Sequence, residues 1–274
     1  MTSPASAAVR DAPQVDTHAH VFTDSMPLAG SAWHRPPRAA TVEEYLATLD
    51  AHGVQYAVLA AASLFGDYND YTIDSLRLHP RLRGTVIVRP DVDRHTLERM
   101  KADGVVGIRL QWITVRDVPD LTSPEYSALL RHVADLDWHV QLHDYAPRLV
   151  QPLAALEAAG VKIVVDHFGR PKPARGIQCE GFQALLRSVE RGRTWVKLSS
   201  GFRLESHEEQ VAHAHELLKT AGPERLFWGS DWPFAAFESK VTYQDTIDSF
   251  TAWVPDPVAR RRIGGETALK FYFS

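Results

Sequence analysis

Eight short apolar runs, each followed by an amphipathic stretch, are the feature of this sequence that most constrains its fold. The runs are rich in Val, Ile and Leu and apolar on both faces, as expected of strands buried in a parallel sheet. Eight such units without a long Pro-, Gly- or Ser-rich linker favour a closed (β/α)₈ TIM barrel over an open doubly wound sheet. The predicted strands are Gln14–His20, Val54–Ala60, Gly84–Arg89, Gly104–Leu110, Trp138–His143, Val161–His167, Thr194–Ser199 and Leu226–Asp231.

The stretches between the runs have the marks of helices. The first begins at Thr41 with Glu44 three residues on, which is the capping-box pattern. We expect one α/β domain over residues 1–274, with 1–13 as a flexible N-terminal segment. The predicted helices are Thr41–His52, Asn69–His79, Asp93–Lys101, Ser123–Leu136, Ala146–Ala159, Glu180–Arg191, Glu205–Thr220 and Asp256–Tyr272.

Composition narrows the class of protein. The net charge is −4 and the pI is near 6.3, which argues against nucleic acid or an anionic membrane as the main partner. The single cysteine, Cys179, allows no internal disulfide and is typical of a reducing compartment. No run approaches the ~20 apolar residues of a membrane span. We therefore expect a cytoplasmic protein, monomeric or homodimeric, that acts on small molecules.

The most specific chemical signal is His18-Ala-His20 at the end of the first predicted strand. Side chains alternate along a strand, so both imidazoles point the same way, roughly 7 Å apart. Two imidazoles aimed at one point can share a metal ion or hold one substrate oxygen. His143, His167 and Asp231 also fall at predicted strand ends, which in a barrel meet at the face that carries the chemistry.

Asp231 and two arginines suggest how such a site would work. Asp231 stands among aromatic residues, where it could ligate a metal or take a proton from water, or only cap the next helix. Arg109 and Arg203 also lie at or just past strand ends, and guanidinium groups there suit substrate carboxylates. The alternative is that both arginines pair with the protein's own acids. His143, Tyr145 and Arg170 complete the expected substrate-binding set, whereas Asp166 is predicted to hold structure.

Four motifs give the chain a family resemblance that spans most of its length. They are Asp-Thr-His-Ala-His-Val-Phe, Asp-His-Phe-Gly-Arg-Pro, Trp-Val-Lys-Leu-Ser-Ser and Leu-Phe-Trp-Gly-Ser-Asp-Trp-Pro. In this order they resemble the amidohydrolase superfamily, and within it the 2-pyrone-4,6-dicarboxylate lactonases. The resemblance implies metal-free hydrolysis of a cyclic ester, with Asp231 activating water. It places histidines around the reacting carbonyl and arginines on substrate carboxylates: His18, His20, His167, Arg109 and Arg203.

The sequence departs from the lactonase pattern at the fifth strand, where His143 stands in place of a tyrosine. Metal-dependent relatives, the decarboxylases among them, use a histidine there as a ligand. With His18, His20 and Asp231 it would complete a set suited to one Zn²⁺. We favour the metal-free interpretation: a hydrolase that opens a small carboxylated lactone, in the breakdown of aromatic or sugar acids. The alternatives are a metal-dependent decarboxylase, a lactone isomerase, or a non-catalytic protein that binds dicarboxylates.

Overall fold

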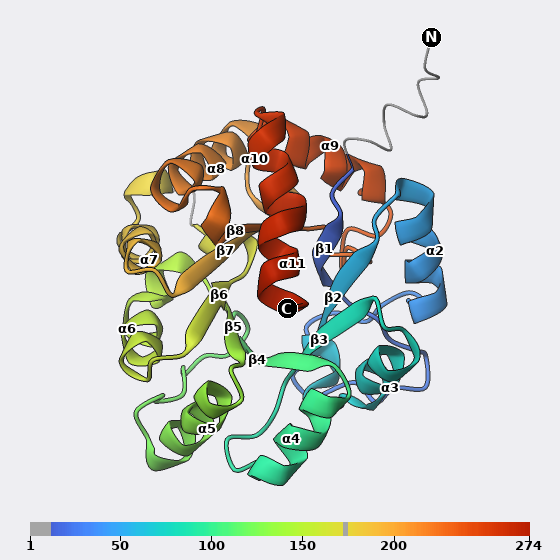
Figure 1. The fold of residues 1–274 in the computed structure, drawn as a ribbon, viewed down its shortest axis with the longest axis vertical. Helices are drawn as coiled ribbons and strands as arrows, with labels where there is room; N and C mark the ends of the chain where they lie inside the picture. Colours follow the sequence, from blue (N-terminus) through green and yellow to red (C-terminus); the bar gives the residue numbers. More distant parts are fainter. Residues whose placement is uncertain (1–11, 172–174) are drawn as a thin grey trace.

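The chain folds as the predicted barrel. A computed structural model describes residues 12–171 and 175–274, so most of the segment predicted to be flexible lies outside the described residues. Eight parallel strands pair in sequence order, and a bridge from Ala19 to Trp232 brings the last strand back to the first. Figure 1 shows the helices as an outer ring around these strands. The strands are β1 (Val15–Ala19), β2 (Tyr56–Ala60), β3 (Leu82–Val86), β4 (Val105–Gln111), β5 (His139–His143), β6 (Lys162–Val165), β7 (Thr194–Ser199) and β8 (Leu226–Gly229).

The third strand differs most from its prediction. It begins two residues earlier than expected, at Leu82, and ends at Val86. Both side chains are fully buried, whereas Arg89, the predicted end, is exposed and pairs with Asp91 in the following loop. The sixth and eighth strands also end early, which leaves His167 and Asp231 in the loops beyond them.

The helices follow the predicted pattern with one omission. Thr41 caps the first helix as expected, accepting a hydrogen bond from the backbone of Glu44. An unpredicted helix, α9 (Tyr243–Trp253), follows the eighth strand and opens with a capping box between Thr242 and Asp245. The others are α2 (Val42–His52), α3 (Asp70–Leu78), α4 (Arg94–Ala102), α5 (Pro124–Asp135), α6 (Val150–Ala158), α7 (Glu180–Glu190), α8 (His207–Ala221), α10 (Pro257–Arg261), a π-helical turn (Arg262–Glu266) and α11 (Thr267–Tyr272).

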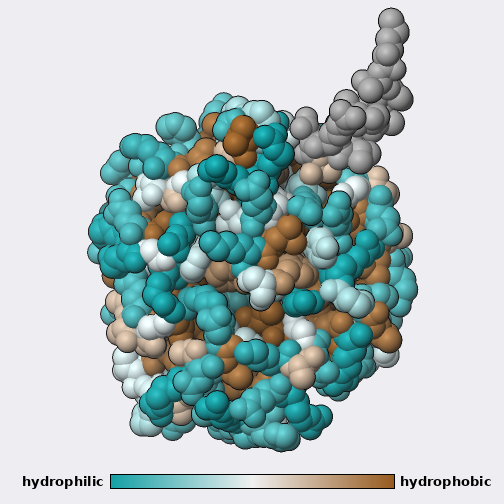
Figure 2. Space-filling model, viewed as in Figure 1, coloured by the Kyte–Doolittle hydropathy of each residue, from teal (hydrophilic) through white to brown (hydrophobic). Residues whose placement is uncertain are grey.

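The last helix closes one end of the barrel. Ala268 and Tyr272 of α11 pack on residues near the amino ends of the strands, among them Val15, Val58 and Phe227. Figure 1 shows α11 lying across this end, and Figure 2 shows the same face as largely hydrophilic, with hydrophobic side chains visible between the polar ones. No helix in the described ranges is long and apolar enough to cross a membrane. The carboxyl ends of the strands are left as the open face of the barrel.

Candidate active site

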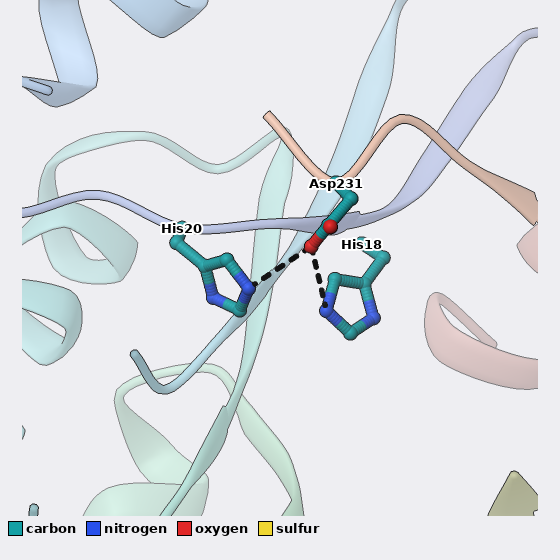
Figure 3. A group of neighbouring side chains, drawn as sticks. All are labelled: His18, His20 and Asp231. Atoms are coloured by element: carbon teal, nitrogen blue, oxygen red, sulfur yellow. Dashed lines mark ion pairs between the residues drawn. The ribbon is translucent and has the colours of Figure 1, made fainter. Parts of the chain in front are cut away.

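The first and last strands bring two histidines and an aspartate together at the open face. His18 lies on β1, His20 directly follows the end of that strand, and Asp231 follows β8 (Figure 3). Asp231 Oδ1 lies 3.3 Å from His20 Nε2 and 3.6 Å from His18 Nε2. Gly229 makes this approach possible, because a Cβ there would lie 2.7 Å from His18 Cβ. His167 Nε2 is 4.0 Å from the same oxygen, so three imidazoles surround one carboxylate oxygen.

The second oxygen of Asp231 is tied to cationic and hydroxyl partners. Ser200 Oγ donates to Oδ2, and Arg203 Nε donates to it at 3.0 Å. Burial alone would raise the pKa of Asp231, but the Arg203 guanidinium holds this pKa well below its usual range. Asp231 is therefore a carboxylate at neutral pH, with Oδ1 directed toward the imidazoles.

The three imidazoles are held by partners on their far sides. His20 Nδ1 lies 2.7 Å from the Ala60 carbonyl oxygen, which only accepts, so this nitrogen carries a hydrogen. His167 Nδ1 lies 2.8 Å from Ser199 Oγ. Burial lowers the pKa of His18 to about 3 and that of His167 well below its usual value. Both imidazoles are therefore neutral at pH 7.

A second buried carboxylate, Asp166, lies behind His18. Its Oδ2 accepts from Gln141 Nε2 at 2.9 Å and from Arg109 Nη2 at 3.2 Å, in the structural role predicted for it. Lys197 Nζ is 3.6 Å from Oδ1 of the same group, and burial lowers the pKa of Lys197 to about 8. Sequence reasoning missed Gln141 and Lys197. The available signal was a lysine placed inside the apolar run of the seventh strand.

The arginines differ in how their charge is balanced. Arg109 pairs with Asp166 and donates to the Ala61 carbonyl at 2.9 Å, while Arg203 pairs with Asp231. Both arginines therefore pair with the protein's own aspartates, which is the alternative that the sequence left open. Arg170 lies 5.4 Å from the centre of the Tyr145 ring and forms no ion pair within the described part of the chain.

A pocket of about 210 Å³ lies at the open end of the barrel, and His20, His167 and Asp231 are part of its lining. Imidazole groups and Asp231 form one part of its lining. Guanidinium groups and apolar side chains such as Trp33 and Leu64 form the rest. A larger hollow of about 1040 Å³ lies at the opposite end, beside α11. We place the site in the smaller pocket because its lining includes nearly the whole predicted set: His20, Arg109, His143, Tyr145, His167, Arg170, Arg203 and Asp231.

His143 is near this group but does not join its metal-compatible core. Among the described residues, candidate ligand atoms of His18, His20 and Asp231 lie within 4.8 Å of one another, without one from His143. The His143 ring instead packs edge-on against His167, with ring centres 4.8 Å apart. Arg109 Nη2 lies 3.4 Å from His143 Nδ1. The structure thus places His143 at the pocket wall.

Comparisons with known proteins agree with the barrel and its site. The model of the amidohydrolase family matches residues 15–273. The chain is 29% identical to the 4-sulfomuconolactone hydrolase of Hydrogenophaga intermedia, over 90% of this chain and 84% of that protein. A putative 2-pyrone-4,6-dicarboxylic acid hydrolase from Pseudomonas putida superposes with a TM-score of 0.87 and 37% identity, over 95% of this chain and 97% of that one.

A second solved structure is similar over the same span. It is a probable 2-pyrone-4,6-dicarboxylic acid hydrolase from Acinetobacter baumannii, with citric acid bound. It superposes with a TM-score of 0.91 and 31% identity, covering 95% of this chain and 99% of that one. The family match covers nearly the whole chain, and the site lies at the barrel end where its chemistry was expected. The chain belongs to the amidohydrolase family.

Proposed function

We propose that this enzyme hydrolyses a small carboxylated lactone, with Asp231 accepting a proton from the attacking water. The observation that carries the proposal is the position of Asp231 Oδ1 between the Nε2 atoms of His18, His20 and His167, at 3.3–4.0 Å. A carboxylate that faces polar groups above a pocket is suited to general-base catalysis. Relatives named as lactone hydrolases support the choice of bond.

The arginines would select a carboxylated substrate. Arg170 has no ion-pair partner among the described residues, so it is the natural first contact for a substrate carboxylate. Arg203 reaches both the pocket and Asp231. When Arg203 also engages the substrate, its hold on Asp231 weakens and the pKa of Asp231 rises. Binding of the correct substrate would thereby strengthen the base that the reaction needs.

The chemical step follows from this arrangement. Asp231 takes a proton from water, and the water oxygen bonds to the ring carbonyl carbon. The resulting oxyanion is stabilised by the surrounding imidazole groups, and such preorganised stabilisation is worth about 3–4 kcal/mol per donor. The ring C–O bond then breaks, and the proton held by Asp231 passes to the departing ring oxygen. The product is an open-chain hydroxy acid or its keto form.

The donor set also fits one divalent metal ion by residue type. His18, His20 and Asp231 would hold it, leaving a coordination position for water. A bound Zn²⁺ would polarise the carbonyl and lower the pKa of water. We favour the metal-free reaction because four cationic side chains already face two carboxylates here, so a further positive ion would be repelled. The cations are Arg109, Arg170, Lys197 and Arg203, and the carboxylates are Asp166 and Asp231.

The test is turnover of lactones with and without ring carboxylates, by protein whose metal content is measured before and after chelation. We expect hydrolysis of carboxylated lactones to persist in metal-free protein and to fall by about 10²–10⁴-fold in Asp231→Asn. Product analysis separates ring opening from isomerisation or loss of CO₂. Wild-type protein that binds dicarboxylates but turns over no lactone would instead support the non-catalytic alternative.

A further inference from the structure

Lys197 is a fully buried lysine inside the barrel, and it has no part in the bond-making and bond-breaking steps of the proposed reaction. It lies on β7 beneath the pocket and has no exposed surface. A buried ammonium is costly unless each of its three hydrogens has an acceptor. Three acceptors surround Nζ: the Thr17 carbonyl at 2.8 Å, His18 Nδ1 at 3.3 Å and Asp166 Oδ1 at 3.6 Å.

The surroundings of His18 Nδ1 identify this atom as an acceptor. Lys197 Nζ lies 3.3 Å and Gln141 Nε2 3.5 Å from it, and both groups can only donate. The Gln141 amide is oriented by Thr85, which donates to its oxygen at 3.2 Å. A third neighbour, Asp166 Oδ1 at 3.2 Å, is a carboxylate oxygen that would accept from a protonated Nδ1. Two donors against one acceptor favour a bare Nδ1, with Asp166 Oδ1 taking its hydrogen bond from Lys197 instead.

A neutral imidazole that accepts at Nδ1 carries its hydrogen on Nε2. In His18 this nitrogen faces Asp231 Oδ1 and the reacting centre. His20 is held differently, because its Nδ1 donates to the Ala60 carbonyl. Within the His-x-His motif, His18 is thus the imidazole that accepts at Nδ1 and offers its Nε2 hydrogen to a developing oxyanion.

We propose that Lys197 is a positioning residue that holds His18 in the Nε2–H tautomer, so that His18 donates to the reacting oxygen and does not ligate a metal. The inference rests on the proposed lactone hydrolysis for its chemical meaning. The assignment of the tautomer itself depends only on the contacts of His18. Asp166 balances the ammonium charge, and Thr17 fixes its place under the first strand.

The direct test is nitrogen NMR of wild-type protein labelled with ¹⁵N-histidine, with the His18 signals assigned from a His18→Gln spectrum. We expect a protonated Nε2 and a bare Nδ1 at neutral pH. A protonated Nδ1 with a bare Nε2 would overturn the proposal. This measurement needs no substrate, so it stands even if the protein proves to hydrolyse no lactone.

Variants separate the hydrogen bond from the charge. Lys197→Met removes both, whereas Lys197→Gln keeps a donor without the charge. Lys162→Met is the matched control, because this β6 lysine pairs with Asp137 outside the barrel interior. In folded Lys197→Met we expect the His18 hydrogen to move to Nδ1, facing Asp166. We expect kcat to fall about 10²-fold with KM little changed.

Lys197→Gln should keep the wild-type tautomer and recover much of the lost kcat, while Lys162→Met should resemble wild type. Release of His18 Nε2 in Lys197→Met should also tighten binding of Zn²⁺, added alone to chelator-treated protein, by about tenfold. An unchanged His18 tautomer in folded Lys197→Met would overturn the proposal. If Lys197→Met fails to fold, the wild-type spectrum and Lys197→Gln still decide the question.

Discussion

Two aspartates near the junction of β1 and β8 are equally buried but have opposite environments. Asp16 points away from the pocket and accepts from Tyr45, Tyr243 and the backbone and hydroxyl of Ser230. Burial raises its pKa, because neutral donors only partly compensate the lost hydration. Asp231 points into the pocket and faces Arg203 and three imidazoles, and its pKa is lowered despite burial.

The difference shows that burial alone does not mark a catalytic carboxylate. Neutral hydroxyl donors make Asp16 a structural link between the barrel and two helices, α2 and α9. Cationic and imidazole partners keep Asp231 ionised, and the pocket gives it access to water and substrate. The type of partner thus separates the two roles.

Asp231→Asn should cause the largest loss. The amide cannot accept a proton from water, so kcat should fall by about 10²–10⁴-fold. The fold should persist, because the side-chain shape is kept. Steady-state kinetics together with circular dichroism provide the measurement. Near-wild-type kcat in a folded Asn variant would remove Asp231 from the mechanism.

Arg203→Met should make Asp231 more like Asp16. Loss of the guanidinium removes the main group that lowers the Asp231 pKa, so the acidic limb of the pH profile of kcat/KM should move upward. KM for a carboxylated lactone should also rise, in line with ~1.5–3 kcal/mol for a lost charge-assisted hydrogen bond. An uncharged lactone is the control. Equal KM increases for both lactones would mean that Arg203 acts only through Asp231.

Asp16→Asn should affect stability and spare the chemistry. The amide nitrogen would face hydroxyl or backbone donors, leaving at least one buried donor unpaired at about 1–3 kcal/mol. Chemical denaturation should show this loss in the free energy of unfolding. The kcat of the folded fraction should stay near wild type. A kcat loss as large as that of Asp231→Asn would contradict the distinction between the two aspartates.

The sequence predicted the barrel because apolar runs on both strand faces and capped helices are local signals. It also predicted that His18, His20 and Asp231 would meet, since strand ends converge at one face. It could not predict the partner of each charge. Arg109 and Arg203 pair with aspartates from other strands, and only the register of distant strands decides such contacts.

The missed residues show the same limit. Lys197 lies within a family motif, yet its role depends on contacts with His18 from the first strand and Asp166 from just beyond the sixth. His167 and Asp231 both have a positive φ in the loops after their strands, so alternation along a strand does not set their direction. Patterns within the sequence thus locate the site. The protonation and the ion pairs of its side chains depend on contacts between distant strands.

His139 is a buried base at the opposite end of the barrel from the site, and burial shifts its pKa in favour of the neutral form, as it does for Asp16. Burial lowers its pKa to about 3, so it binds no proton in the folded protein as pH falls from 6.5 toward 3, whereas the unfolded chain does. Its contribution is therefore intact above pH 6.5 and is lost as pH falls, by up to about 1.4 kcal/mol per pH unit. His139→Leu should reduce this slope in urea denaturation measured between pH 7 and 4, while kcat stays near wild type. A slope equal to wild type would show that His139 gains a proton without unfolding, and that burial without a counter-charge does not keep this base neutral.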